Sequence, residues 1–318
     1  YDQYRWKTFN NRKNIMFQDL FFTTIPLFTM VFIGYFFGKT SIFNQLDANT
    51  LLKLVGLIIL PTLGVKIIGG FRYEFINWDL YFCYLAGQVT IYFFAFTITK
   101  IVFKRNNCEA IIVAMTSSFS NHLWFVYPIA LFEFGPQDVV PIETIISADF
   151  ITVGLSVCAL DVMSKKETSI VRLAVKQIKN PALLGLFLGL VVYWSDFPIP
   201  LSIERLVDLI CDAGTPCALI AMGILLSFRT DTTQIKLAVL ITALKVFVFP
   251  IIVTSIVFLA ITDVTVSRTT LMVSAAPIGS MGLIFASLYN VQTGAVVRAG
   301  IFTYILALLT VPFVGTLI

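Results

Sequence analysis

The residues best suited to chemistry form a polar stretch, 117–128, inside an apolar segment that covers residues 110–134. That segment is long enough to cross a bilayer, where lipid offers the backbone no hydrogen-bond partners. It holds the only histidine of the chain, and Pro128 removes one intrahelical bond and disfavours a helical conformation in the residue before it. The stretch therefore predicts a helix that breaks near the middle of the membrane, where irregular backbone must be buried in protein or line a wet cavity.

A broken helix has two chemically active ends. The N-terminus of the second half suits an anion, and the free carbonyl groups of the first half suit a cation or a proton donor. Secondary transporters bind substrates and ions at such ends. We therefore expect Ser120, Asn121, His122 and Pro128 to line a site for a small anion. His122 either carries a coupled proton or bonds a backbone carbonyl, and the alternative for the whole stretch is a proline kink packed against neighbouring helices.

A second apolar segment, 269–289, has a similar small and polar centre at residues 274–282. It contains a proline followed by glycine and serine, so a second break is expected there. We assign Pro277, Gly279 and Ser280 to the same anion site.

Four further ionisable residues lie at membrane depth: Lys66, Asp149, Asp212 and Lys245. Such residues are costly in lipid unless they are paired or hydrated, so each is a candidate for ion or proton coupling, together with His122. Lys66 is close enough to a helix end to reach the interface. Lys245 could instead neutralise Asp149 or Asp212, in which case their role is structural pairing.

The composition is that of a polytopic helical membrane protein. Of 318 residues, 58% are hydrophobic and 13% are charged, whereas soluble domains have about 25% charged residues. At ~20 residues per span, the chain holds about ten spans. It has no HExxH, GxSxG or paired-carboxylate motif, so we expect no enzyme activity, no metal and no cofactor. The five cysteines form no CxxC pair, and the basic loop is too short to indicate nucleic-acid binding.

The ten expected spans follow a polar tail, 1–19, that is either an amphipathic surface helix or disordered. Their approximate ranges are 20–37, 50–68, 80–102, 110–134, 141–163, 180–194, 203–226, 237–261, 269–289 and 291–317.

Prolines indicate an internal repeat of five spans. Pro61 and Pro216 lie in the second span of each half, and Pro128 and Pro277 lie in the fourth. Because five is odd, the second half starts on the opposite side of the membrane, which predicts an inverted repeat. The predicted halves are 20–163 and 180–318, joined by a basic loop at 164–179.

The charge of the connections predicts the orientation. Ten Lys and Arg residues lie on the side of the 164–179 loop and three on the other side. The positive-inside rule then places this loop in the cytoplasm and both termini on the non-cytoplasmic side. We expect a plasma membrane or a bacterial inner membrane.

Several short sequence motifs, and the order in which they occur, resemble those of the auxin efflux carrier family, within the superfamily of bile acid, arsenite and riboflavin-type transporters. That family includes plant PIN exporters, bacterial malonate-type carriers and the carrier-like half of a lysosomal cholesterol sensor. The motifs are Leu60-Pro61-Thr62-Leu63, Asn121 followed seven residues later by Pro128, Asn180-Pro181, Lys245 five residues before Pro250, and Ala276-Pro277. The chain departs from the family at Leu123 and Val126, where glycines are frequent, and at His122.

The resemblance implies an all-α fold of ten spans in two inverted repeats, with crossed breaks in spans 4 and 9. It implies a secondary transporter of a small organic anion, a mono- or dicarboxylate like auxin or malonate, that works by an elevator or rocking motion. It also suggests a homodimer formed through the first helices of each half. The alternative is a transporter-like sensor that binds a small ligand or a sterol without net transport.

Overall fold

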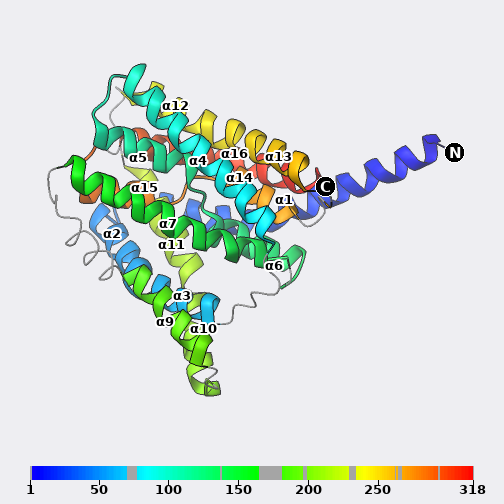
Figure 1. Cartoon of the computed structure of the whole chain (residues 1–318), viewed down its shortest axis with the longest axis horizontal. Coiled ribbons are helices and arrows are strands. Elements are labelled where there is room, and N and C mark those ends of the chain that lie inside the picture. Colours follow the sequence, from blue (N-terminus) through cyan, green and yellow to red (C-terminus); the bar gives the residue numbers. More distant parts are fainter. Residues whose placement is uncertain are drawn as a thin grey trace. The chain divides into compact units, whose positions relative to one another are not determined.

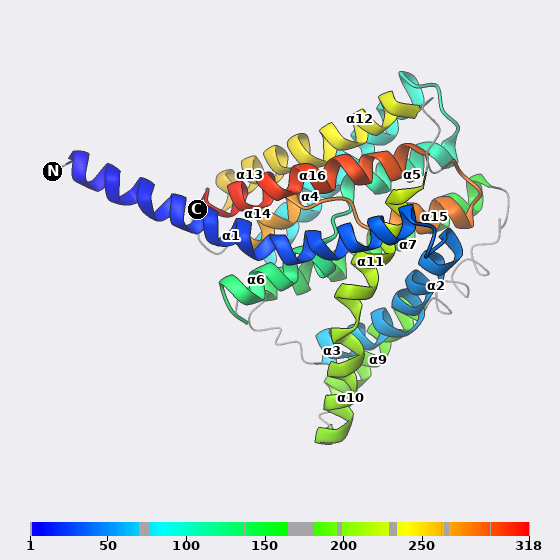
Figure 2. The same cartoon turned by 180° about the vertical axis from the view of Figure 1, so that it is seen from behind.

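The computed structural model describes residues 2–69, 77–136, 138–164, 181–195, 199–228, 234–261, 263, 267–292 and 294–317. The regular elements of these ranges are helices (Figures 1 and 2). Most of the predicted basic loop lies outside the described residues, as do Arg72, Asn180 and Arg229.

Six described helical segments are long and apolar enough to cross a bilayer. They are Met16–Lys39, Gln45–Lys66, Trp78–Ile101, Leu201–Ser227, Ile235–Ala260 and Gly294–Gly315. The prediction of an all-helical, multi-pass membrane protein is therefore confirmed at this level.

The chain divides into two compact units, and each takes segments from both predicted halves. Unit 1 consists of residues 1–29, 77–148 and 230–318, and unit 2 of residues 30–76 and 149–229. Two helices, α1 (Asp2–Lys39) and α7 (Val140–Met163), continue from one unit into the other. Sequence halves and compact units are thus different divisions of this chain, and the inverted repeat stays a prediction.

Unit 1 contains the two segments for which breaks were predicted. Its helices, besides parts of α1 and α7, are α4 (Trp78–Ile101), α5 (Asn107–Ser118), η3 (His122–Val126), α6 (Tyr127–Glu133), α12 (Ile235–Ala243), η5 (Leu244–Val248), α13 (Phe249–Ala260), α14 (Arg268–Ala275), α15 (Met281–Leu288) and α16 (Gly294–Gly315). Helix α4 packs on α5 and α13, and α16 packs on α12 and α14. Helices α12 and α13 follow each other through η5 and together run alongside α16 (Figure 2).

Unit 2 is held together by close helix approaches at glycines. Its complete helices are α2 (Gln45–Leu54), η1 (Val55–Ile59), α3 (Leu60–Gly69), α9 (Pro181–Ser195), α10 (Leu201–Asp212) and α11 (Gly214–Ser227). A Cβ on Gly223 would overlap the carbonyl of Val31, and a Cβ on Gly34 would overlap that of Ile220. In lipid, the hydrophobic effect does not drive helices together, so they associate by close packing at small residues. These glycines therefore let the backbones of α1 and α11 pack directly against each other.

Three of the prolines follow a π-helical turn, and the helix continues through each of them. A π turn holds one extra residue and widens the helix. The widening moves aside the carbonyl group with which the proline ring would clash. The helix then needs no hydrogen bond from the proline nitrogen, which carries no hydrogen. The pairs are Val55–Ile59 with Pro61, His122–Val126 with Pro128, and Leu244–Val248 with Pro250.

Pro128 therefore does not mark the break of its segment. The helix ends at Ser118, and Phe119 at its C-cap is extended, several residues before the proline. The predicted tail, 1–19, belongs to the continuous helix α1, which begins at Asp2.

Candidate functional site

Two helix interruptions meet in unit 1. The first separates α5 from η3, and the second separates α14 from α15. The backbone N–H of Asn121 donates to the carbonyl of Pro277 at 2.8 Å, and that of Gly279 donates to the carbonyl of Phe119 at 3.4 Å. Ser120 and Ile278 form an isolated antiparallel bridge between these bonds.

Helix ends that are distant in sequence thus satisfy part of each other's backbone hydrogen bonding. We call this bridged pair of interruptions the crossing. A Cβ on Gly279 would lie only 3.3 Å from the carbonyl oxygen of Ser120, so a larger residue there would press on the crossing. In addition, α15 packs on α5 and α14 packs on η3. The residues predicted from the two polar stretches are therefore brought together.

A lysine supplies positive charge at the crossing. Lys245 is completely buried, and its Nζ donates to Ser120 Oγ at 2.8 Å and to the carbonyl oxygen of Ser274 at 2.7 Å. The same nitrogen lies 4.6 Å from the ring centroid of Phe249. The hydroxyl of Tyr84 lies 3.4 Å from Ser120 Oγ, which extends the polar contacts to α4. Because η5 is a π turn, Lys245 projects from a widened part of its helix.

Asn121 and His122 are both buried beside the bridge. The Asn121 Nδ2 donates to the hydroxyl of Tyr304 at 2.6 Å, and the Tyr304 ring packs edge-on against Phe125. The Nδ1 of His122 lies 3.0 Å from the carbonyl oxygen of Ser120, so Nδ1 carries the hydrogen of this bond. His122 thus bonds a carbonyl, which was one of its two predicted roles.

Two of the other predicted site residues, Pro277 and Ser280, contribute main-chain carbonyls to hydrogen bonds. Pro128 is half-buried in the first turn of α6, and Pro277 contributes its carbonyl. Ser280 is half-buried just before α15, and its carbonyl accepts the N–H of Ile284 at 3.0 Å.

The predicted coupling residues divide between the units. Lys245 lies in unit 1, whereas Lys66, Asp149 and Asp212 belong to unit 2. Asp149 is buried in α7, and Asp212 is exposed at the end of α10. Lys66 pairs with Asp208 at 2.7 Å, and both side chains are nearly half exposed. An exposed ion pair contributes little stability.

Sequence reasoning missed several hydroxyl groups at the crossing. Besides Tyr84 and Tyr304, Thr303 Oγ1 accepts the N–H of Ile278 at 3.4 Å, and Thr310 Oγ1 donates to the carbonyl of Ala275 at 3.3 Å. A buried tyrosine hydroxyl usually has a partner. A tyrosine in the middle of an apolar span was therefore a signal that could have identified Tyr304.

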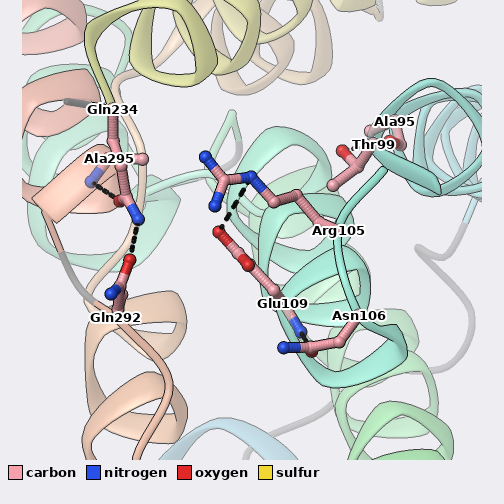
Figure 3. Close-up of polar contacts among 8 residues, drawn as sticks. All are labelled: Ala95, Thr99, Arg105, Asn106, Glu109, Gln234, Gln292 and Ala295. Carbon is pink, nitrogen blue, oxygen red and sulfur yellow. Dashed lines mark hydrogen bonds and ion pairs between the residues drawn. The ribbon is translucent and has the colours of Figure 1, made fainter. Parts of the chain in front are cut away.

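A second polar cluster lies where α5, α12 and α16 begin (Figure 3). The Gln234 side chain donates to Gln292 Oε1 and accepts the N–H of Ala295 at 3.0 Å. Just before α5, Arg105 Nε lies 3.7 Å from Oε1 of the buried Glu109 in the first turn of that helix (Figure 3). Gln234 thus joins the chain before α12 to the first turn of α16.

The chain is similar to a family of transport proteins, to a provisionally named transporter and to a signalling protein. A family model described as membrane transport protein matches residues 137–314, more than half of the chain. A protein of Rhizobium meliloti (strain 1021), provisionally named a malonate transporter, is 25% identical over 211 residues, which cover 64% of this chain and 66% of the relative. The lysosomal cholesterol signaling protein of Mus musculus is 22% identical over 309 residues, which cover 86% of this chain and 34% of the relative. The chain spans less than two thirds of each relative.

Proposed function

The chain belongs to the membrane transport protein family, which confirms its resemblance to the auxin efflux carriers, and on that premise we propose a secondary transporter of small organic anions. The observation that carries the proposal is the crossing, in which Asn121 and Pro277 join two interrupted helices inside one compact unit. Discontinuous helices of this kind bind substrates in secondary transporters.

The chemistry of the crossing favours an anion. Helix α15 begins at Met281, immediately after the second interruption, and its N-terminus is the positive end of the helix dipole. The ammonium group of Lys245 adds a full positive charge, and the amide of Asn121 adds hydrogen-bonding capacity. A mono- or dicarboxylate fits the α15 N-terminus and the Asn121 amide, with Lys245 supplying positive charge nearby, and the relative provisionally named a malonate transporter supports malonate as the first candidate.

The transport mechanism that we propose is alternating access in a ten-span, inverted-repeat protein. The interruptions in the fourth span of each predicted half support the repeat. The division into two compact units supports an elevator or rocking motion, in which the unit with the crossing carries the substrate. We further propose that the working form is a homodimer.

Uptake into liposomes tests the proposal. The purified chain is reconstituted, and accumulation of radiolabelled malonate is compared with that of indole-3-acetate and an uncharged analogue. Asn121→Ala is the site variant, and Gln45→Ala, at an exposed position of α2, is the control. Uptake of one carboxylate by the wild type and the control, but not by Asn121→Ala, supports the proposal. Absence of flux for every carboxylate contradicts it.

A sensor without transport is the second candidate. It is favoured by the similarity to the lysosomal cholesterol signaling protein, which covers 86% of this chain. Thermal stabilisation by a carboxylate or by cholesterol, with no flux in the same liposomes, would assign the chain to this class.

The proposed orientation is tested by labelling single cysteines in a variant that lacks the native ones. A cysteine at Asp138 should react with an impermeant maleimide from outside the cell, whereas a cysteine at Ser169 should react only after permeabilisation. The reverse pattern would contradict the count of positive charges.

A further inference from the structure

The positive charge at the crossing belongs to the protein itself. The Ser274 carbonyl, which accepts from Lys245 Nζ, lies in the last turn of α14. Carbonyl groups in the last turn have no partner within their helix and form the negative end of its dipole. An ammonium group therefore occupies the place where an interrupted helix would attract a cation.

Neighbouring carbonyl groups of the same turn also have donors. The carbonyl of Ala275 accepts from Thr310 Oγ1 at 3.3 Å, and that of Val273 accepts the N–H of Ala276 at 3.2 Å. The last three carbonyl groups of α14, those of Val273, Ser274 and Ala275, are therefore all hydrogen-bonded within unit 1. The turn is thus satisfied by groups of the chain.

The surroundings of Lys245 favour its charged form. The Ser120 hydroxyl and the Ser274 carbonyl both act as acceptors toward its Nζ. The ring of Phe249, 4.6 Å away, presents a face that attracts cations. A buried ammonium group without such partners would be costly at membrane depth.

In transporters with interrupted helices, unwound carbonyls and half-helix C-termini bind the coupling ion. We propose that the ammonium group of Lys245 is the resident cation of this crossing, so that substrate binding requires no alkali cation there. This inference rests on the proposed transport function and deepens it, because it assigns Lys245 a structural charge that is present throughout the cycle.

Replacing Lys245 tests the inference by stability. Lys245→Ala leaves Ser120 and Ser274 without their donor and opens a space about the size of an alkylammonium ion. In detergent, with N-methylglucamine as the background cation, we expect Lys245→Ala to unfold at a lower temperature than the wild type. Ethylammonium should restore this temperature saturably, whereas it should not stabilise Lys245→Met, whose side chain fills the space. The control is Lys236→Ala, at an exposed position of α12, which should behave like the wild type.

Two results would overturn the inference in this assay. One is saturable stabilisation of the wild type by sodium, which would reveal an alkali-cation site. The other is a folded Lys245→Ala that does not respond to ethylammonium but has lost affinity for malonate, which would make Lys245 a direct substrate ligand.

Replacing the buffer cation in uptake by the wild type tests whether an alkali cation is required, even if Lys245→Ala does not fold. Malonate uptake should be equal in sodium, potassium and N-methylglucamine buffers of the same pH and ionic strength. A fall of at least about tenfold without sodium, which corresponds to ~1.4 kcal/mol, would overturn the inference while leaving transport established. If no buffer supports uptake, the proposed transport function fails, and the thermal assay alone decides the role of Lys245.

Discussion

The backbone N–H of Asn121 donates to the carbonyl oxygen of Pro277 at 2.8 Å, across two interrupted helices that are distant in sequence. Buried backbone groups that leave a helix must find other partners, and these two find each other. The bond holds the side chain of Asn121 beside the start of η3. The geometry of the proposed anion site therefore depends on main-chain contacts, to which side chains add chemistry.

Asn121→Ala should weaken substrate binding without unfolding the protein. A hydrogen bond to a charged group contributes about 1.5–3 kcal/mol, and about 1.4 kcal/mol corresponds to tenfold in affinity. We therefore expect malonate affinity to fall roughly ten- to hundredfold in a calorimetric titration.

Tyr304→Phe separates this effect from the loss of the Asn121–Tyr304 bond. It removes the hydroxyl partner but leaves the amide for substrate, so its effect on affinity should be smaller. Normal affinity in a monodisperse Asn121→Ala would remove Asn121 from the site.

Gly282→Ala should disturb the packing of α15 on α5. A Cβ on Gly282 would overlap Thr116 Oγ1, so the neighbouring helices must shift. Overpacking of this kind costs typically about 1–3 kcal/mol, and we expect a lower unfolding temperature and slower uptake.

A double variant tests the mechanism of that effect. Adding Thr116→Ala should recover much of the loss, because it removes the overlapping atom. Gly154→Ala is the matched control, since its Cβ would meet no atom within 4 Å. Equal unfolding temperatures for Gly282→Ala and Gly154→Ala would show that the close contact is unimportant.

The pH dependence of uptake should distinguish His122 from Asp149. His122 Nδ1 bonds the Ser120 carbonyl, and asparagine can keep a donor at that position without titrating. We expect His122→Asn to retain the pH dependence of the wild type. Asp149 is a buried carboxyl in α7, so Asp149→Asn should flatten the profile while exchange continues. A flat profile in His122→Asn alone would reverse the assignment.

Gln234→Ala should loosen the start of α16. The variant loses the bonds to Gln292 and to the N–H of Ala295, and leaves a buried donor without its partner. Each lost bond is worth about 0.5–1.5 kcal/mol, so the unfolding temperature should fall measurably. Gln234→Glu keeps an acceptor for Ala295 but loses the donor to Gln292, and should have an intermediate effect. Faster amide exchange at Ala295 in the alanine variant would locate the change.

The general fold and both interruptions could be predicted from the sequence. Spans in lipid are apolar, so polar and proline-containing stretches within them are easily recognised. It did not locate the first interruption correctly relative to Pro128, because a π turn lets the helix continue through that proline. The choice between a π turn and a break depends on neighbouring helices, which no local pattern describes.

The candidate site was predicted only in part for a similar reason. Asn121, His122 and Lys245 were identified because their types are rare at membrane depth. The partners Tyr304 and Ser274 were not, since which group each of them contacts depends on tertiary structure.

The three π turns also make the length of the chain critical at specific points. Removing one residue from η5 would restore an ordinary α-helix, because a π turn holds one extra residue, and the ring of Pro250 would then meet the carbonyl that the π turn moves aside. Lys245, which is inside η5, would lose the widened turn from which it reaches Ser120 and Ser274. Insertions and deletions in members of this family should therefore fall in connections and avoid the π turns Val55–Ile59, His122–Val126 and Leu244–Val248.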